Sequence, residues 1–553
     1  MPKQRARPWL DHYDYWVPRH ANYPRRPLYE ILRRAAAEGG DLPALTFFGC
    51  DVTFTELKRH ADRLATALAA SGIGKGDRIG IMLPNCPQYV IAAFAVLRLG
   101  AIVVNLNPAY APPEIEHLVR DSGVRMLLTL DRLAASVAAL RSKTALETVI
   151  VTSLTELTAD GTPPQDVPGT LRFADLIDPT REINLPRVSI DPDHDIAVLQ
   201  YTGGTTGVPK AAMLTHRNIF ANTIQTELWH HRSTERGRDR FLLVIPYFHI
   251  YGLTVGMMRG IWQGARQILI PKYDVEAVLA AIRDYQPTYF PAVPTIYVSL
   301  LNHPRLREFN LDRVCTYYSG SAPIALDVIE QFERLVNVPL QQGYGLSEAS
   351  PVTHSTPHLA RRKPASIGLP MPDTDMKIVD LDTGSIELPF GAEGELCVAG
   401  PQIMKGYWNK PDETAIALRT DEDGVTWLHT GDIARVDEDG FVFIVQRKKD
   451  MIIVDGYNVY PSEVEAALHA HPAVMEAAAI GVPHGYHGEV VKAAVVLKPG
   501  HLVTADDLKA HCAGRLAEFK RPRAIEIRNS LPKSAVGKIL YTTLRAEAAA
   551  QHA

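Results

Sequence analysis

The sequence predicts an α/β protein: a large N-terminal domain of two doubly wound βαβ subdomains plus a small β-rich subdomain, followed by a small α+β C-terminal domain. The first observation is length, because 553 residues exceed what one hydrophobic core can organise. The second is that strand-like and helix-like stretches alternate twice, over 78–128 and again over 241–335. The third is a change in the residue pattern near Gly368, after which short strand-like stretches and frequent turn residues follow.

The first round of alternation follows an N-terminal segment rich in proline, arginine and aromatic residues. A helical pattern begins at 28–32, and we expect a second helix from Thr55, as its N-cap, to about residue 70. Strand and helix candidates then alternate as in a parallel sheet with helices on both faces. These candidates are 78–83, 87–99, 101–104, 113–121 and 125–128.

The second round begins beyond a Gly/Pro/Asp-rich loop at 159–170. Its candidates are a strand at 241–245, a helix at 274–285, a strand at 288–290 and a helix at 323–335. The β-rich part contains strands at 376–379 and 394–398, and the C-terminal unit contains a helix at 462–469, strands at 474–480 and 492–497, and a helix at 504–516. We place the boundary after residue 446, which gives domains of 1–446 and 447–553.

Composition restricts the function classes. The formal net charge is −4 and the pI is about 6.6, so the chain has no electrostatic signature of nucleic-acid binding. Five scattered cysteines without metal-type spacing are typical of a reducing cytoplasm. The N-terminus has no apolar signal region, and Arg98 and Gly100 interrupt the most apolar segment, 89–104. We therefore expect a cytoplasmic protein without a transmembrane segment.

The stretch 201–210, Tyr-Thr-Gly-Gly-Thr-Thr-Gly-Val-Pro-Lys, predicts a phosphate-binding loop. The apolar run 196–199 precedes it, which is typical of a buried strand that ends in a tight loop. Glycines let backbone N–H groups turn toward an anion, while the threonine hydroxyls and Lys210 add further donors. It is not a Walker A loop, because Val208 and Pro209 separate the last glycine from the lysine. The alternative is a flexible surface loop.

Four further stretches lie far from this loop in the sequence: Gln-Gly-Tyr-Gly-Leu-Ser-Glu at 342–348, His-Thr-Gly-Asp at 429–432, the segment 446–461, and Pro-Lys-Ser-Ala-Val-Gly-Lys at 532–538. Together the five resemble the adenylate-forming (ANL) superfamily, over nearly the whole chain. The superfamily includes acyl-CoA synthetases, aryl-CoA ligases, firefly luciferase and peptide-synthetase adenylation domains. The resemblance implies that a carboxylate attacks the α-phosphate of ATP, diphosphate leaves, and the acyl group passes from AMP to a thiol. It also implies Mg²⁺ as cofactor, CoA as co-substrate and a mobile C-terminal domain.

The resemblance implies several ATP- or AMP-binding positions. The glycine loop would hold the departing diphosphate, Asp432 would accept both ribose hydroxyls, and the ring of Tyr344 would stack on adenine. The alternatives are a plain turn for Asp432 and a core tyrosine for Tyr344. The full set is Thr202, Gly203, Gly204, Thr205, Thr206, Lys210, Gly320, Ser321, Ala322, Gln342, Gly343, Tyr344, Ser347, Asp432, Arg447 and Asn458.

Four residues match catalytic positions of the superfamily. Lys538 would bridge the carboxylate and the α-phosphate in the adenylation transition state. Glu348 would bind Mg²⁺, and His249 would border the carboxylate and later the thioester channel. Lys449 would be the hinge about which the C-terminal domain turns between the two half-reactions. On their own, the lysines and the glutamate would be read as solvated, and the histidine as a core residue.

The acyl and thiol sites are marked less clearly. Lys272, Asp455 and Gly456 match CoA-contacting positions, although the superfamily often has another residue type in place of Asp455. Met257 and Met258 offer a deformable apolar wall for the acyl chain, or ordinary core.

The opening stretches 9–14 and 23–24 resemble the leader of bacterial long-chain fatty-acid–CoA ligases. We therefore expect ligation of a medium- or long-chain fatty acid to CoA. An aryl-CoA ligase, a fatty acyl-AMP ligase that serves a carrier protein, and a non-catalytic nucleotide-binding protein remain as alternatives. The sequence does not determine the length of the acyl chain, whether the protein forms a homodimer, or whether it contacts a membrane peripherally.

Overall fold

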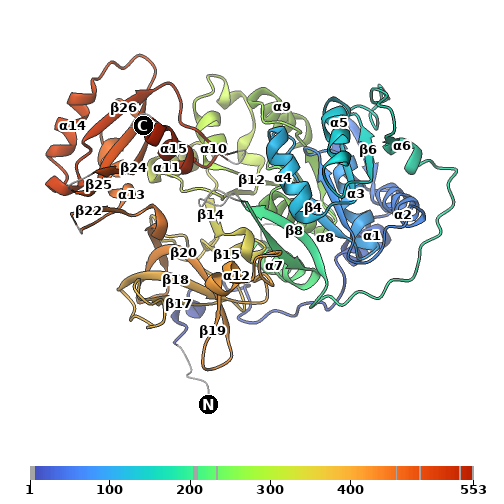
Figure 1. Cartoon of the computed structure of the whole chain (residues 1–553), viewed down its shortest axis with the longest axis horizontal. Helices are drawn as coiled ribbons and strands as arrows, with labels where there is room; N and C mark the ends of the chain where they lie inside the picture. Colours follow the sequence, from blue (N-terminus) through green and yellow to red (C-terminus); the bar gives the residue numbers. More distant parts are fainter. Residues whose placement is uncertain are drawn as a thin grey trace. The chain divides into compact units, whose positions relative to one another are not determined.

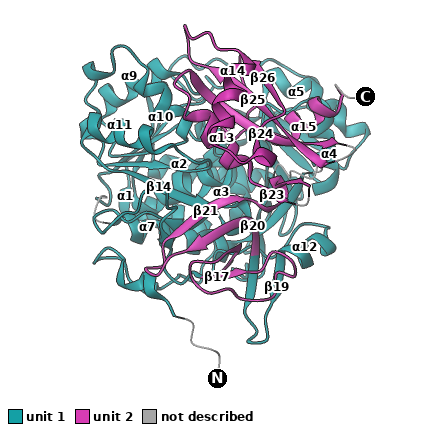
Figure 2. Cartoon of the chain, turned by 90° about the vertical axis from the view of Figure 1, so that its left-hand side faces the viewer, with its two compact units in different colours: residues 1–203, 209–375, 399–428 teal, residues 204–208, 376–398, 429–553 magenta. Residues whose placement is uncertain are grey.

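The computed structural model describes residues 6–202, 209–231, 235–455, 457–484, 487–534 and 537–550. The chain forms two compact units (Figure 2). Unit 1 comprises 1–203, 209–375 and 399–428, and unit 2 comprises chiefly 376–398 and 429–553. The predicted domain boundary after residue 446 stays a prediction.

A seven-stranded sheet in unit 1 has the order β7-β6-β5-β3-β4-β8-β9. Figure 1 labels its strands β4, β6 and β8. All neighbouring strands are parallel except β8 and β9. Helix α3 lies against β3 and β4, so the chain crosses from one parallel strand to the next through a helix. This confirms the predicted first round. The strands are β3 Arg78–Met82, β4 Ile102–Asn105, β5 Met126–Leu130, β6 Thr148–Thr152, β7 Leu171–Arg172, β8 Ile196–Thr202 and β9 Lys210–Thr215, with helices α3 Pro87–Arg98, α4 Pro112–Ser122, α5 Asp131–Ala138 and α6 Phe173–Leu176.

A nine-stranded sheet in unit 1 has the order β16-β15-β14-β13-β12-β10-β11-β1-β2. The strands from β14 to β1 are parallel, and antiparallel strands flank them at both edges. The strands are β1 Pro43–Phe47, β2 Cys50–Thr53, β10 Arg240–Leu243, β11 Arg266–Leu269, β12 Tyr289–Ala292, β13 Thr316–Ser319, β14 Leu340–Gly345, β15 Val352–Ser355 and β16 Leu369–Pro370. The other helices of unit 1 are α1 Tyr29–Gly39, α2 Phe54–Ala70, α7 His216–His230, α8 Arg259–Gln263, α9 Val275–Tyr285, α10 Pro294–Leu301, α11 Leu326–Val336 and α12 Pro411–Ala417.

Helix α2 begins earlier than predicted. Its N-cap is Thr53 rather than Thr55, because the Thr53 hydroxyl accepts the Glu56 N–H while the Glu56 carboxylate accepts the Thr53 N–H. A capping box needs an acidic or amide residue three positions after the cap, and Thr55 has Lys58 there.

Unit 2 contains the β-rich part. Strands β17 Asp375–Val379, β18 Glu393–Ala399 and β20 Thr426–Val436 lie in one sheet, and β21 Val442–Arg447 pairs with β20. Within unit 1, β19 Leu418–Thr420 pairs with the first residues of β20. The short strands after Gly368 are thus confirmed.

The C-terminal sheet has the order β23-β22-β25-β24, with β26 parallel to β25. Its apolar faces form two clusters, one with α13 and α14 and one with α15. The elements are β22 Ile452–Val454, β23 Tyr457–Val459, β24 Val474–His484, β25 Gly488–Leu497, β26 Ala524–Arg528, α13 Pro461–His469, α14 Ala505–Ala513 and α15 Tyr541–Ala550. Over the described residues, no helix combines the length and apolarity needed to cross a bilayer.

Candidate functional site

The predicted phosphate loop connects two antiparallel strands. Strand β8 ends at Thr202, β9 begins at Lys210, and these two residues are register partners. The Thr202 hydroxyl donates to the Lys210 carbonyl at 3.3 Å, which closes the base of the hairpin. Gly203, Gly204, Thr205 and Thr206 lie outside the described residues. The predicted strand before the loop is confirmed as β8, while the antiparallel strand β9 after it was not predicted.

Lys210 and Glu348 come together around Tyr407. The Lys210 ammonium lies 5.5 Å from the centroid of the Tyr407 ring, and the Tyr407 hydroxyl donates to Glu348 Oε1 at 2.7 Å. Lys210 also forms an ion pair with Glu413, and its side chain is 18% exposed. A cation and a carboxylate, far apart in sequence, therefore share one aromatic neighbour in unit 1.

Backbone pairing holds Tyr407 in this place. The segment 404–408 runs beside β9: Met213 N–H donates to Gly406 O at 2.8 Å, and Trp408 N–H donates to Ala211 O at 2.8 Å. The Met404 N–H donates to the Glu348 carbonyl, also at 2.8 Å. The sequence reasoning missed Tyr407 and Glu413 as site residues. The only available signal was a resemblance of 404–409 to bacterial long-chain fatty-acid–CoA ligases, and that resemblance gave Tyr407 no role.

The residues predicted to surround adenine lie at the ends of adjacent strands. Gln342 on β14 is the register partner of Ser319, the last residue of β13, so Gln342 lies next to the segment Gly320, Ser321 and Ala322. A Cβ on Gly343 would lie 2.0 Å from the Tyr318 hydroxyl, so this position requires glycine. The 320–322 segment and the 342–344 segment are thus brought together.

Tyr344 is half-buried and its ring meets the His354 ring edge-on, with centroids 5.9 Å apart. Ser347 and Glu348 follow in a short 3₁₀ helix, Ser347–Ala349. Stacking of Tyr344 on adenine stays a prediction.

His249 lies three residues before a π-helical stretch, Gly252–Met258. Its Nδ1 accepts the Tyr251 N–H at 3.3 Å, and the Tyr251 hydroxyl donates to the Tyr318 carbonyl at 3.0 Å. π-Helical turns are rare and are frequent at functional sites. Met257 and Met258 are fully buried in this stretch, whereas Lys272 is exposed. His249 is therefore connected through Tyr251 to the strand that leads into the 320–322 segment.

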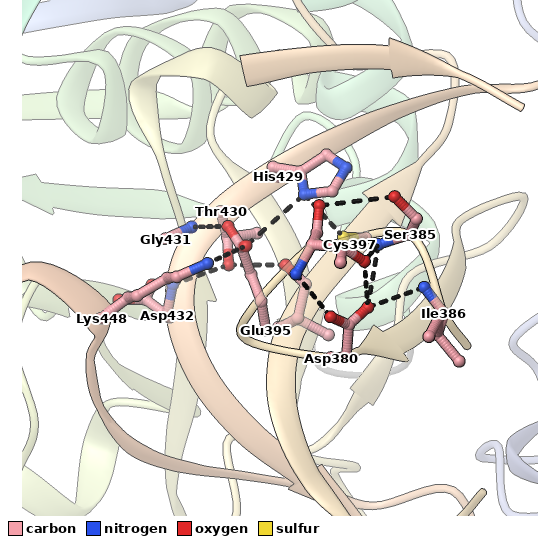
Figure 3. A network of polar contacts seen from close by, with 12 residues as sticks. Asp380, Ser385, Ile386, Glu395, Cys397, His429, Thr430, Gly431, Asp432 and Lys448 are labelled. Atoms are coloured by element: carbon pink, nitrogen blue, oxygen red, sulfur yellow. Dashed lines mark hydrogen bonds and ion pairs between the residues drawn. The ribbon is translucent and has the colours of Figure 1, made fainter. Parts of the chain in front are cut away.

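In unit 2, Asp432 is 2% exposed and lies within strand β20, directly after Gly431. The positive φ of Gly431, 71°, departs from regular strand conformation, and we call 430–432 the bend of β20. Arg447 on β21 is its register partner, with Nε 2.6 Å from Asp432 Oδ1. Thr430 holds the bend, since its hydroxyl donates to the Leu396 carbonyl at 2.8 Å and accepts the Asp432 N–H at 3.1 Å. Figure 3 shows this bend beside Glu395 and Lys448. The two predicted ribose residues thus form a pair.

The remaining predicted positions follow β21. Lys449 is exposed in the 3₁₀ turn Lys448–Asp450. Asp455 has a positive φ of 52° and its carboxylate lies 2.6 Å from His487 Nδ1. Asn458 is exposed on β23, and Gly456 lies outside the described residues.

Lys538 is exposed and directly precedes Ile539, which forms an isolated bridge with Lys533. The Lys538 N–H donates to Ser534 Oγ at 3.2 Å. Lys533 connects this bridge to β24, because its ammonium lies 2.5 Å from Glu476 Oε1. These contacts support the backbone at Lys538, while its side chain is exposed.

Comparison with known proteins agrees with these motifs. Residues 32–408 match the model of the AMP-binding enzyme family, and residues 463–538 match the AMP-binding enzyme C-terminal domain. A long-chain-fatty-acid–CoA ligase of Bacillus subtilis is 43% identical, with 99% of each chain covered. A 4-coumarate–CoA ligase of rice (Oryza sativa subsp. japonica) is 36% identical, covering 95% of this chain and 93% of the relative.

Among solved structures, the anthranilate CoA ligase AuaEII in complex with anthranoyl-AMP superposes with a TM-score of 0.84 and 28% identity, covering 96% of this chain and 98% of that one. The α/β architecture is therefore shared over nearly the whole length. The chain belongs to the AMP-binding enzyme family, the adenylate-forming superfamily that its motifs resemble.

Proposed function

We propose that this chain is an acid–thiol ligase that converts a medium- or long-chain fatty acid, ATP and CoA into acyl-CoA, AMP and diphosphate through an acyl-adenylate. The observation that carries the proposal is the Lys210–Tyr407–Glu348 arrangement at the base of the β8–β9 hairpin. It places a cation and a carboxylate where a loop rich in glycine and threonine returns to the sheet. Phosphoryl transfer needs this kind of positioning and charge neutralisation more than covalent help from the protein.

Each residue has a role that its chemistry supports. Thr202, the glycine loop and Lys210 bind the departing diphosphate, and Ser347 hydrogen-bonds the α-phosphate. Asp432 accepts the ribose hydroxyls, with Arg447 holding its carboxylate in place. Lys538 neutralises the charge that develops between the acyl carboxylate and the α-phosphate.

Glu348 fits Mg²⁺. One carboxylate oxygen accepts the Tyr407 hydroxyl, and within the described part of the chain the second oxygen has no hydrogen-bond partner. Such an oxygen is a preferred magnesium ligand. When bound, the ion would neutralise phosphate charge.

The fatty-acid preference is supported by the higher identity to the long-chain ligase than to the 4-coumarate ligase. His249 would border the acyl carboxylate, and Lys272, Asp455, Gly456 and Asn458 would contact CoA or the nucleotide. We also propose a cytoplasmic location, supported by five free thiols, which suit a reducing compartment. Homodimer formation would be tested by light scattering.

Diphosphate release tests the proposal, measured with decanoate, palmitate, benzoate and a cinnamate, each with and without CoA. We expect release with the two fatty acids and AMP release that depends on CoA. Preference for the aromatic acids would replace the assignment by an aryl-CoA ligase. Diphosphate release with accumulation of acyl-AMP, and no release of AMP when CoA is added, would indicate an acyl-AMP ligase. No diphosphate release with any acid would indicate a non-catalytic nucleotide-binding protein.

A further inference from the structure

Glu395, on β18, is a buried carboxylate for which the proposed reaction has no role. It is 6% exposed and faces three polar groups (Figure 3). Its Oε1 accepts the Gly431 N–H at 3.0 Å, while its Oε2 lies 3.3 Å from Lys448 Nζ and 3.5 Å from His429 Nδ1. Burial raises the pKa of Glu395, but its neighbours, His429 and Lys448 first, outweigh burial and hold the pKa below its ordinary value. The carboxylate is therefore ionised inside the unit.

The first oxygen supports the turn that carries Asp432. Gly431 has a φ of 71°, and a Cβ there would meet nothing within 4 Å, so backbone conformation and not space requires the glycine. Two hydrogen bonds join the bend to β18. The Gly431 N–H donates to Glu395 Oε1, and the Thr430 hydroxyl donates to the Leu396 carbonyl. Without Glu395, one side of the bend that orients Asp432 would lose its hydrogen-bond acceptor.

The second oxygen holds the segment in front of the hinge. Lys448 lies between Arg447, which pairs with Asp432, and Lys449, the predicted hinge. The Lys448 side chain is 37% exposed, while that of Glu395 is only 7% exposed. The buried Glu395 carboxylate therefore holds the more exposed Lys448 ammonium in place. His429 lies against the same oxygen and also meets Cys397 Sγ at 3.4 Å. Glu395 thus reaches two segments: Oε1 accepts the Gly431 N–H, and Oε2 meets Lys448 as well as His429, which precedes Gly431 by two residues.

Resting on the proposed function, we propose that Glu395 is a positioning residue for both half-reactions. Its Oε1 fixes the ribose-binding turn and its Oε2 restrains the residue before the hinge. One carboxylate thereby couples nucleotide binding to the swing of the C-terminal domain.

Three variants separate the two contacts. Glu395→Ala removes both, Glu395→Gln keeps an acceptor for Gly431 N–H but loses the charge, and Lys448→Met removes only the hinge partner. Calorimetry gives AMP affinity, diphosphate release gives KM for ATP, and thioester formation from supplied acyl-AMP gives the second half-reaction. Glu393→Gln, an exposed acid two residues earlier on β18, is the matched control.

We expect Glu395→Ala to weaken AMP binding and raise KM for ATP about tenfold, as loss of a charged hydrogen bond does. Glu395→Gln and Lys448→Met should keep AMP affinity within about twofold and shift the ratio of the two half-reaction rates by about fivefold, both in one direction. The control should change neither quantity.

Unchanged AMP affinity in Glu395→Ala would overturn the proposal, as would an unchanged rate ratio in the other two variants. If Glu395→Ala does not fold, the ratios of the two half-reaction rates in Glu395→Gln and Lys448→Met decide whether the proposal stands. A wild-type protein that releases no diphosphate refutes the proposed function separately, and the AMP affinities then still decide whether Glu395 supports the ribose turn.

Discussion

Glu465 on α13 makes the stability of the C-terminal sheet depend on pH. Its Oε1 accepts the Ala479 N–H and the Tyr541 hydroxyl, both at 2.9 Å. Burial, and secondarily the charge of Asp450, raise the pKa of Glu465 from 4.5 to about 7. Arg545 lies 2.7 Å from Asp450 and balances that charge, whereas none of the ion pairs among the described residues includes Glu465. The native state therefore holds a proton on Glu465 that the unfolded chain has already released near neutral pH.

The sign follows from proton linkage. Between pH 4.5 and 7 the folded protein binds more protons than the unfolded chain, so the free energy of unfolding falls as pH rises. The contribution is fully present below 4.5 and is lost once the pH exceeds about 7. A separation of about 2.5 pH units corresponds to roughly 3 kcal/mol, and because the residue keeps some exposure we expect about 1–3 kcal/mol.

Glu465→Gln should remove this dependence, because a glutamine oxygen can accept the same two hydrogen bonds and carries no charge. Hydrogen exchange of peptides covering β24, corrected for intrinsic rates, would measure the free energy of opening at pH 5 and pH 8. We expect wild type to lose about 1–3 kcal/mol more than the variant between these values. The exposed Glu518→Gln serves as control and should follow wild type. Parallel curves for wild type and Glu465→Gln would refute the reasoning.

Three further predictions concern the reaction. Lys538→Ala should lower the rate of adenylation about 100- to 1000-fold and leave thioester formation from supplied acyl-AMP much less affected; equal losses in both assays would reject the assignment. Lys449→Pro should stiffen the hinge and slow mainly thioester formation, so an unchanged single-turnover rate for that step would argue against a hinge there. Tyr407→Phe removes the hydrogen bond to Glu348 and should raise the Mg²⁺ concentration needed for half-maximal activity about fivefold; an unaltered Mg²⁺ titration would dissociate Tyr407 from metal binding.

Local patterns predicted the elements well because their physical causes are local. The alternation over 78–128 comes from apolar strands and amphipathic helices, and the structure places β3 to β5 with α3 and α4 in this stretch. The N-cap of α2 shows where the reasoning failed. Thr53 and Thr55 are equally good caps as residue types, and only the reciprocal contact with Glu56, three residues after Thr53, distinguishes them.

Long-range contacts could not be predicted in the same way. Tyr407 reaches Glu348 because segment 404–408 pairs with β9, and no periodicity reports pairing between segments about 200 residues apart. Motif matching supplied Lys210, Glu348, Asp432 and Arg447, and the structure joins the first two through Tyr407 and the last two directly. Contacts of the predicted lysine Lys538 with substrate stay a prediction.

Lys210 and Asp432 differ in exposure, and this difference suits the different tasks that we propose for them. Lys210 keeps 18% of its side chain exposed beside Tyr407, so an arriving phosphate can exchange places with Glu413 at modest desolvation cost. Asp432 is nearly buried and bonded to Arg447, and a turn fastened to β18 fixes its carboxylate. In the proposed reaction, Lys210 releases diphosphate in every turnover and benefits from an exchangeable partner, whereas Asp432 only orients the ribose and benefits from rigidity. Glu395 lies on β18, the strand next to β20, and we propose that it supports Asp432 and also restrains the hinge. Its loss should therefore affect nucleotide affinity and domain motion together, without altering binding of diphosphate.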